Sequence, residues 1–436
     1  MNFRILAVTL SVGLAPIGPA LCQSQPADTL RLDVLQQTAL ERDPRAREID
    51  LLAEQTRLRL RNIGAERLPA LSVVGQGQHQ SDVARIPITL PGGATAPPPP
   101  HDTYDARIEA QQRLIDPTAR SRRAVEAAEL AASQARVRTS LHAQRQAVND
   151  AFFAALEAQA QIGELGTTIT DLEAQLEVAA ARVREGSALP SEQNAIRAEL
   201  LRRRQSRDEL GAIRRASLAV LASLTGRALD TASVLELPDY SARVDRARDS
   251  LSGLRGRAEY EEFARTREVL VRREEARGAQ DKPRVGAFGR VGYGRPGLNP
   301  LSDRFDSYWL AGIQLQWTPW TWGSSRRDAQ VLALQRQIVA AEESAFTERL
   351  RRAVTQDAEN IDRLESAIAT DDEIVALRER IAAETRARFI ENAVTAAEFV
   401  DRQTDVLSAR MARALHRAEL AEARARFLTT LGIEVR

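Results

Sequence analysis

Residue types that commonly carry chemistry are few in this chain, and their spacing does not build a reaction centre. The 436 residues include four histidines and one cysteine, Cys22. The histidines are His79, His101, His142 and His416. They lack the spacing of metal ligands, and no second cysteine can join them. Because the chain also has no GxSxG and no Walker sequence, we expect no enzymatic activity, no metal and no cofactor.

Residues 292–297 have the glycine spacing of a nucleotide-binding loop. They read GYGRPG, which fits the GxGxxG pattern. In a dinucleotide-binding fold this pattern leads from a strand into a helix whose N-terminus holds the pyrophosphate. Here the segment leads into a loop that contains Pro296 and Pro300. We therefore expect no dinucleotide site.

The composition is that of long helices. Hydrophobic residues make up 43%, charged residues 28% and aromatic residues only 4% of the chain. An excess of Ala, Leu, Arg and Glu with few aromatic residues is typical of coiled coils. So much charge argues against a polytopic helical membrane protein, and a net charge of +1 argues against nucleic acid as a partner.

Residues 1–22 have the pattern of a secretory signal peptide. Arg4 precedes a short apolar run, and cleavage after Cys22 leaves Ala20 and Cys22 as the small residues of the site. The alternative is a lipoprotein acylated on Cys22, although Leu21 stands where such a signal has a small residue. No later stretch provides the roughly 20 apolar residues of a spanning helix, so a membrane crossing would have to use strands.

Two halves of the chain follow the same plan, which predicts structural repeats over residues 23–236 and 237–436. Each repeat is expected to contain a helix, two strands, a very long helix and a shorter returning helix. In the first repeat these elements cover 28–67, 69–80, 104–115, 118–185 and a return that ends near 225. In the second repeat they cover 243–278, 284–294, 307–319, 324–391 and a return that ends near 431. The offset is about 205 residues, and the breaks before the returning helices align at Glu185–Gly186 and Glu391–Asn392.

The long helices carry the heptad pattern of a coiled coil. In the first of them apolar residues recur at steps of three and four, which places one stripe against a partner helix. The stripe consists of Ile162, Leu165, Ile169, Leu172, Leu176, Ala179 and Val183. At 1.5 Å per residue the long helix is a rod of roughly 100 Å, about twice as long as the returning helix. The sequence therefore predicts a mainly α fold of long antiparallel helical pairs beside a small β part.

The predicted strands have one apolar and one polar face. Trp309 and Trp317 share the apolar face of one strand and stand roughly 26 Å apart along it. Aromatic residues at both ends of an apolar band match the interfacial girdles of outer-membrane barrels, so we expect both tryptophans at a membrane interface. The alternative is packing in the core of a small soluble sheet. Four strands cannot close a barrel and open edges cannot face lipid, so membrane-spanning strands require an oligomer.

Local sequences add a resemblance to a known family. Its opening helix, strand-to-helix joints and tip turns have counterparts here, in the same doubled order of elements. These counterparts are Leu30–Ala46 with Asp43–Pro44, residues 111–123 and 314–327, and residues 184–186 and 389–392. The chain thus resembles the TolC family of outer-membrane efflux proteins over nearly its whole mature length.

The resemblance implies a homotrimer in the outer membrane of a Gram-negative bacterium. Four strands from each protomer would form one shared transmembrane β-barrel in contact with lipid, and the helices would form an α-barrel across the periplasm. The helical tips would dock on a periplasmic adaptor protein and connect the duct to an inner-membrane RND or ABC transporter. These tip residues are Glu185, Gly186, Ser187, Glu391, Asn392 and Ala393. The implied function is that of a passive channel in a tripartite efflux or type I secretion system.

The resemblance also implies an acidic ring at the periplasmic entrance. The family often has two acidic residues three positions apart on the second returning helix, and Glu398 and Asp401 occupy the matching positions. Three copies would gather these carboxylates at one constriction, where they would attract cations. The alternative is that both residues lie on a solvated helix face. Val394 stands where the family often has an arginine, so an arginine latch is not expected at that position.

Two further functions are compatible with the same patterns. One is a soluble periplasmic coiled-coil scaffold whose strands form a docking sheet. The other is a duct dedicated to polypeptide secretion with an ABC transporter. Retention in the outer membrane distinguishes both ducts from the scaffold.

Overall fold

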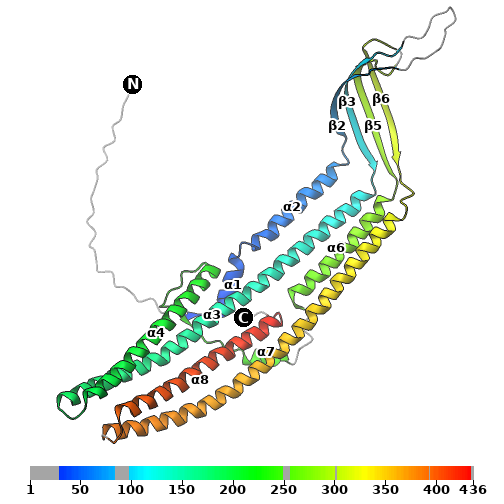
Figure 1. Ribbon diagram of the computed structural model, residues 1–436. Helices are drawn as coiled ribbons and strands as arrows, with labels where there is room; N and C mark the ends of the chain where they lie inside the picture. Colours follow the sequence, from blue (N-terminus) through cyan, green and yellow to red (C-terminus); the bar gives the residue numbers. More distant parts are fainter. Residues whose placement is uncertain (1–28, 84–97, 249–255, 300–301, 392, 434–436) are drawn as a thin grey trace, which may run out of the picture.

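The computed structural model describes residues 29–83, 98–248, 256–299, 302–391 and 393–433. The predicted signal peptide and the alternative acylation of Cys22 lie outside these residues. The molecule is elongated, with a four-stranded sheet at one end and the turns of two helical hairpins at the other (Figure 1).

The elements occur in the same order in the two halves of the described chain. The first half contains β1 (Thr29–Leu30), α1 (Leu32–Arg42), α2 (Ala46–Ala65), β2 (Ala70–His79), β3 (Asp102–Ile115), α3 (Thr118–Arg184) and α4 (Pro190–Thr225). The second half contains β4 (Val234–Leu235), α5 (Ser241–Arg248), α6 (Ala258–Gln280), β5 (Arg284–Arg295), β6 (Asp306–Gln316), α7 (Ser324–Ile390) and α8 (Ala396–Thr430). The predicted class, long helices with a small β part, is confirmed.

The first helix of each half differs from the prediction. The expected helix over 28–67 is split into α1 and α2 because Asp43 adopts an extended conformation before Pro44. The Asp43 carboxylate then accepts the backbone N–H of Arg45 at 2.9 Å, which starts the next helix. The expected helix over 243–278 is likewise replaced by α5 and α6, and the extended backbone of Arg257 precedes the second of these.

Two short strands missed in the sequence tie the halves together. β1 pairs in parallel with β4, through Thr29 with Val234 and Leu30 with Leu235. The Gln159 side chain of α3 donates to the Leu235 carbonyl at 2.9 Å and accepts its N–H at 3.0 Å. Strands of two residues show no periodicity, so only this pairing reveals them.

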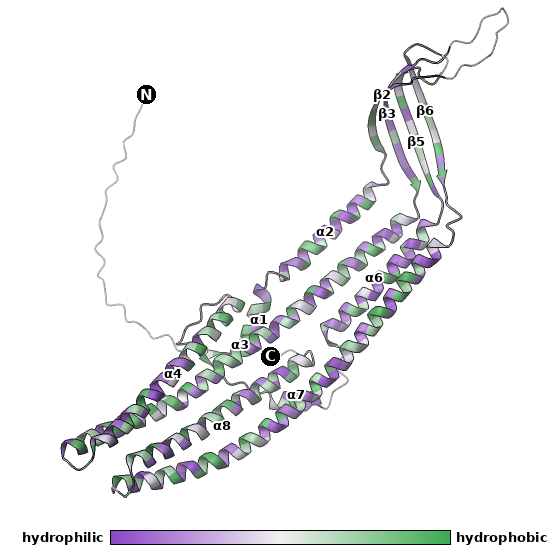
Figure 2. Cartoon of the chain, in the orientation of Figure 1, coloured by the Kyte–Doolittle hydropathy of each residue, from purple (hydrophilic) through white to green (hydrophobic). Residues whose placement is uncertain are grey.

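The long helices form two antiparallel hairpins, α3 with α4 and α7 with α8, which lie side by side. Figure 2 shows hydrophobic and hydrophilic residues alternating along them. The predicted heptad stripe of α3 is buried at Leu165, Ile169, Leu172 and Ala179. Within the described residues, none of the helices combines the length and apolar character needed to cross a membrane.

The main core lies about halfway along the molecule. Fully buried side chains from α1, α3, α4, α7 and α8 meet there, and α5 and β4 cover them. The largest of these side chains include Leu35, Phe152, Phe153, Leu221 and Phe427. This core fixes the hairpins at one end of the molecule relative to the sheet at the other.

Candidate functional site

The sheet exposes its apolar face. Its strands are antiparallel in the order β2-β3-β5-β6. One row of cross-strand partners runs through Val73, Ile108, Val291 and Trp309. These four side chains are 82%, 55%, 64% and 74% exposed. A contiguous exposed apolar face of this kind marks a surface that meets a partner or a membrane.

The opposite face carries charges that are paired with one another. The Arg107 guanidinium forms ion pairs with Asp105 and with Glu109. Arg290 of β5 pairs with the same Glu109 at 3.2 Å, and the Tyr308 hydroxyl of β6 donates to Asp105. This network crosses three strands and keeps its polar groups satisfied on the face away from the apolar row.

The glycine motif has a packing role in this network. Gly292 lies opposite Arg107 and Tyr308 in the sheet. A Cβ atom at Gly292 would stand 2.6 Å from the Tyr308 ring. The segment continues β5, and the next element among the described residues is the strand β6, which is inconsistent with a dinucleotide-binding turn that opens a helix.

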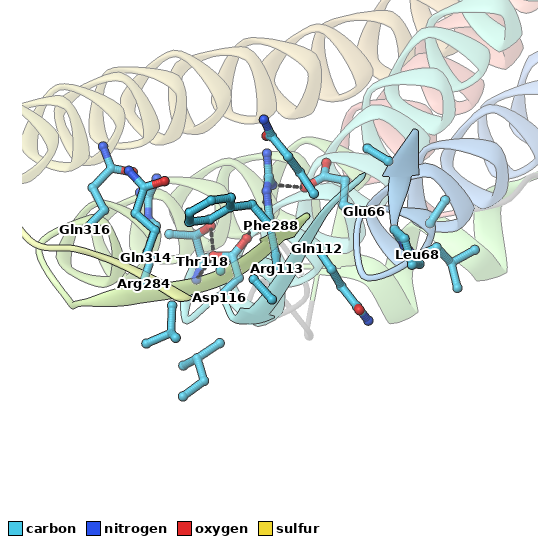
Figure 3. A pocket seen from close by; sticks show the side chains of 18 of the residues that line it. Glu66, Leu68, Gln112, Arg113, Asp116, Thr118, Arg284, Phe288, Gln314 and Gln316 are labelled. Atoms are coloured by element: carbon cyan, nitrogen blue, oxygen red, sulfur yellow. Dashed lines mark hydrogen bonds and ion pairs between the residues drawn. The ribbon is translucent and has the colours of Figure 1, made fainter. Parts of the chain in front are cut away.

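A hollow of about 770 Å³ lies where the sheet meets the helices (Figure 3). In its wall, Arg113 and Arg122 both bind the carboxylate of Glu66 at the end of α2. Asp116 accepts hydrogen bonds from the hydroxyl and the backbone N–H of Thr118, at the start of α3. The bond from Arg122 holds the pKa of Glu66 below its usual value. These ionised pairs stiffen the strand-to-helix joint.

The two predicted interface tryptophans lie at opposite ends of the exposed face of β6. Trp309 faces outward near the loop end of the strand, and Trp317 follows the strand at its helix end. The Trp317 indole N–H donates to the backbone carbonyl of Asp281 at 3.1 Å, which fixes the ring against the end of α6.

A second group of aromatic residues at the loop end was missed in the sequence. The ring of Phe305 stacks on Tyr104 and Tyr293 with centroid distances of 6.3 and 5.6 Å. Tyr104 and Tyr293 share the exposed face with Trp309. Tyr104 lies on β3 and Tyr293 on β5, with α3, α4 and α6 between them in the chain, so only the register brings these rings together.

The predicted helical tips have matching turns. In the first, the backbone N–H of Ser187 donates to the Arg182 carbonyl at 2.9 Å, and Gly186 has a positive φ of 72°. In the second, the N–H of Ala393 donates to the Arg388 carbonyl at 2.8 Å. Glu185 and Glu391 precede the two turns as exposed residues. Asn392, the remaining predicted tip residue, lies outside the described part of the chain.

A small core, also missed in the sequence, joins the two tips. Phe389 at the end of α7 stacks on Phe399 of α8 at a centroid distance of 5.0 Å. The guanidinium of Arg182, on α3, lies 5.6 Å from the centroid of the Phe389 ring. Ile196 of α4 completes this cluster, so all four long helices contribute to it.

Glu398 and Asp401 are exposed near the start of α8. Phe399 between them is buried in the tip core, so the helix directs both carboxylates away from it. The Thr395 hydroxyl caps the helix by accepting the Glu398 N–H at 3.2 Å. One copy of the chain brings these two acidic residues to the tip, but it cannot make a ring alone.

The fold is that of bacterial outer membrane channels. The first of the solved structures with this fold is the outer membrane protein VceC of Vibrio cholerae, with a TM-score of 0.66, 15% identity and coverage of 92% of this chain and 96% of that one. Another is the CmeC outer membrane channel of Campylobacter jejuni, with a TM-score of 0.66 and 13% identity; the match covers 98% of this chain and 94% of CmeC. The MtrE outer membrane channel of Neisseria gonorrhoeae also has this fold, with a TM-score of 0.65 and 19% identity; the match covers 93% of this chain and 90% of MtrE. The resemblance to the TolC family is thereby confirmed at the level of the fold.

The comparisons of sequence alone are negative. No family model matches the chain, and neither does any curated protein.

Proposed function

We propose that this chain is one subunit of a trimeric outer-membrane channel that exports solutes from the periplasmic side. The observation that carries the proposal is the exposed apolar face of the sheet. Burial of such a face in lipid is favourable, whereas in water it promotes association. The paired charges of Arg107, Asp105 and Glu109 on the other face suit the wall of a water-filled lumen.

The open edges of the sheet favour an oligomer. β2 and β6 are the edge strands, and no other strand in the described part of the chain pairs with their outer sides. Unpaired backbone groups cannot face lipid, and the smallest transmembrane barrels have about eight strands. Four strands from each of three copies satisfy both requirements.

The helices support the same assembly. Leu334 and Ile338, one turn apart on α7, are large apolar side chains that this copy leaves exposed. Leu377 and Ile381 repeat the pattern further along the helix. Packing of these stripes against the hairpin of a neighbouring copy would close the helices into a hollow cylinder in the periplasm.

The position of the two helical tips supports the proposed partners. The turns at Glu185 to Ser187 and at Glu391 to Ala393 lie at the end of the molecule opposite the sheet, where a periplasmic adaptor would reach them. Such an adaptor would join the duct to an inner-membrane RND or ABC transporter, which supplies the energy of a tripartite efflux or type I secretion system. Glu398 and Asp401 of three copies would ring the entrance and favour cations there.

Membrane fractionation and single-channel recording test this proposal. The full-length protein is expected in the outer-membrane fraction, as a trimer in detergent that resists heating, with discrete conductance steps in planar bilayers. A monomer that is soluble without detergent and forms no channels would contradict the proposal and support the soluble scaffold instead.

A further inference from the structure

Trp320 and Trp322 form an exposed aromatic pair in the connection between β6 and α7. They are 70% and 82% exposed. Their rings meet edge to face at a centroid distance of 5.9 Å. Figure 1 shows this connection projecting from the side of the molecule before α7 begins. Most of the surface of both rings is therefore left uncovered by the protomer.

The backbone directs this pair outward. Trp322 has a φ of 51° and Gly323 has a φ of 74°, so two successive residues are left-handed. This conformation is unfavourable for a bulky aromatic residue. The Arg327 side chain holds it by donating to the Trp322 carbonyl at 3.2 Å. A strained backbone that exposes a large apolar ring indicates a partner outside the protomer.

The pair continues the exposed face of the sheet. Ile313, Leu315 and Trp317 lead along the outward face of β6 directly to the connection. An apolar band of about 25 Å that begins near Trp309 ends close to Trp317, so the next residues fall at the level of lipid head groups. Exposed Arg326 and Arg327 follow at the start of α7, where they can bind phosphate groups.

The first repeat has no exposed aromatic pair at the corresponding connection. Its strand-to-helix connection after Ile115 consists of Asp116 and Pro117 and carries no aromatic residue. The corresponding arginine Arg122 is bound to Glu66 rather than free for an external anion. The aromatic pair thus occurs in the connection between β6 and α7 but not in the equivalent connection between β3 and α3.

We propose that Trp320 and Trp322, with Arg326 and Arg327, bind phospholipid head groups of the inner leaflet and anchor the helix end of the sheet in the bilayer surface. Indole rings favour this interface because they combine an apolar body with one N–H donor. This inference rests on the proposed channel function and adds a lipid-binding site that is specific to the second repeat.

Tryptophan fluorescence in vesicles tests the proposal. The chain has four tryptophans. The double variant W309F/W317F therefore reports only on Trp320 and Trp322. In phosphatidylethanolamine/phosphatidylglycerol vesicles its emission is expected to be blue-shifted, and phospholipids brominated near the carbonyl group should quench more than about half of it. Phospholipids brominated near the chain end should quench it less.

The matched control variant W320F/W322F separates this inference from the channel proposal. One outcome would overturn the anchor and leave the channel intact. In it, brominated lipid quenches Trp309 and Trp317 in the control, while aqueous iodide still reaches Trp320 and Trp322 in W309F/W317F. Protection of the pair from both iodide and brominated lipid would show that protein covers it and would also overturn the anchor. Absence of lipid quenching in both variants would overturn the channel proposal as well. If W309F/W317F fails to fold, subtraction of the control signal from that of the unmodified protein gives the same measurement.

Discussion

In the proposed trimer, the role of Glu398 and Asp401 would depend on the neighbouring copies of the chain. In one protomer they are exposed carboxylates beside a capped helix start. Around a three-fold axis the same groups would face one another, and repulsion among them would be relieved by bound cations. The pair therefore provides a direct test of the proposed entrance.

The double variant E398Q/D401N is expected to weaken block of the single-channel current by multivalent cations. Loss of the charges removes the electrostatic attraction, so the blocking concentration should rise about tenfold or more. The matched control is Glu192→Gln, because its neighbour at the equivalent position is Ala195 and it forms no acidic pair. Equal block in the double variant and the unmodified channel would remove the ring from the mechanism.

Glu157 of α3 gives a prediction about pH. Burial, together with the nearby Glu422 and Glu419, raises its pKa to about 7 from an ordinary value of 4.5. The folded state thus binds more protons than the unfolded state between these two values, and stability falls as the pH rises through this window. Glu157→Gln is expected to be about 1 kcal/mol more stable than the unmodified protein at pH 8, and to gain little at pH 5.

Urea unfolding of the helical signal at the two pH values measures this difference. The control is Glu177→Gln on the exposed side of α3. An equal gain at both pH values would contradict the assignment of the shift to Glu157.

At the scale of elements, the exposure of the two sheet faces is the reverse of that in a soluble sheet. The apolar residues of β3 face outward, while its charged residues form the less exposed network. Alternation alone does not distinguish these two arrangements, because a soluble sheet has the same period of two. The exposed row through Ile108 and Val291 decides between them.

Ile108→Arg is expected to destabilise the protein in lipid. The residue lies in the middle of β3 on the exposed face, and a cation at the centre of a bilayer costs about 2 to 4 kcal/mol. The amount of the Ile108→Arg variant in the outer membrane and the resistance of this variant to urea in vesicles should both fall. Gln111→Arg, on the opposite face of the same strand, should have little effect, and an equal loss in both variants would contradict the outward orientation.

At the scale of the whole molecule, the proposed trimer would pair the sheet edges and cover the apolar stripes of α7 with other copies of the chain. Leu334→Lys is expected to weaken the trimer by about 2 kcal/mol, because it places a charge in the proposed interface between helices. The midpoint temperature of trimer dissociation in detergent gives the measurement. Gln335→Lys, on another side of the helix, is the control, and a stable Leu334→Lys trimer would show that this stripe faces solvent.

The sequence by itself determined the features that repeat along a single segment. The heptad steps around Leu165 and Leu172 predicted the long paired helices, and the period of two predicted the strands and their faces. These signals are local because helix and strand geometry impose a fixed spacing on the side chains of one face. Asp43–Pro44 lies inside the single helix expected over 28–67, and the split into α1 and α2 at this point was not predicted.

Only the tertiary structure decided which distant segments meet. The stack of Phe305 on Tyr104 and Tyr293 depends on strand register, and the contact of Arg182 with Phe389 depends on the packing of two hairpins. The β1–β4 pair is too short to leave a pattern. Such contacts are set by three-dimensional packing between residues far apart in the chain, and a one-dimensional pattern carries no record of that packing.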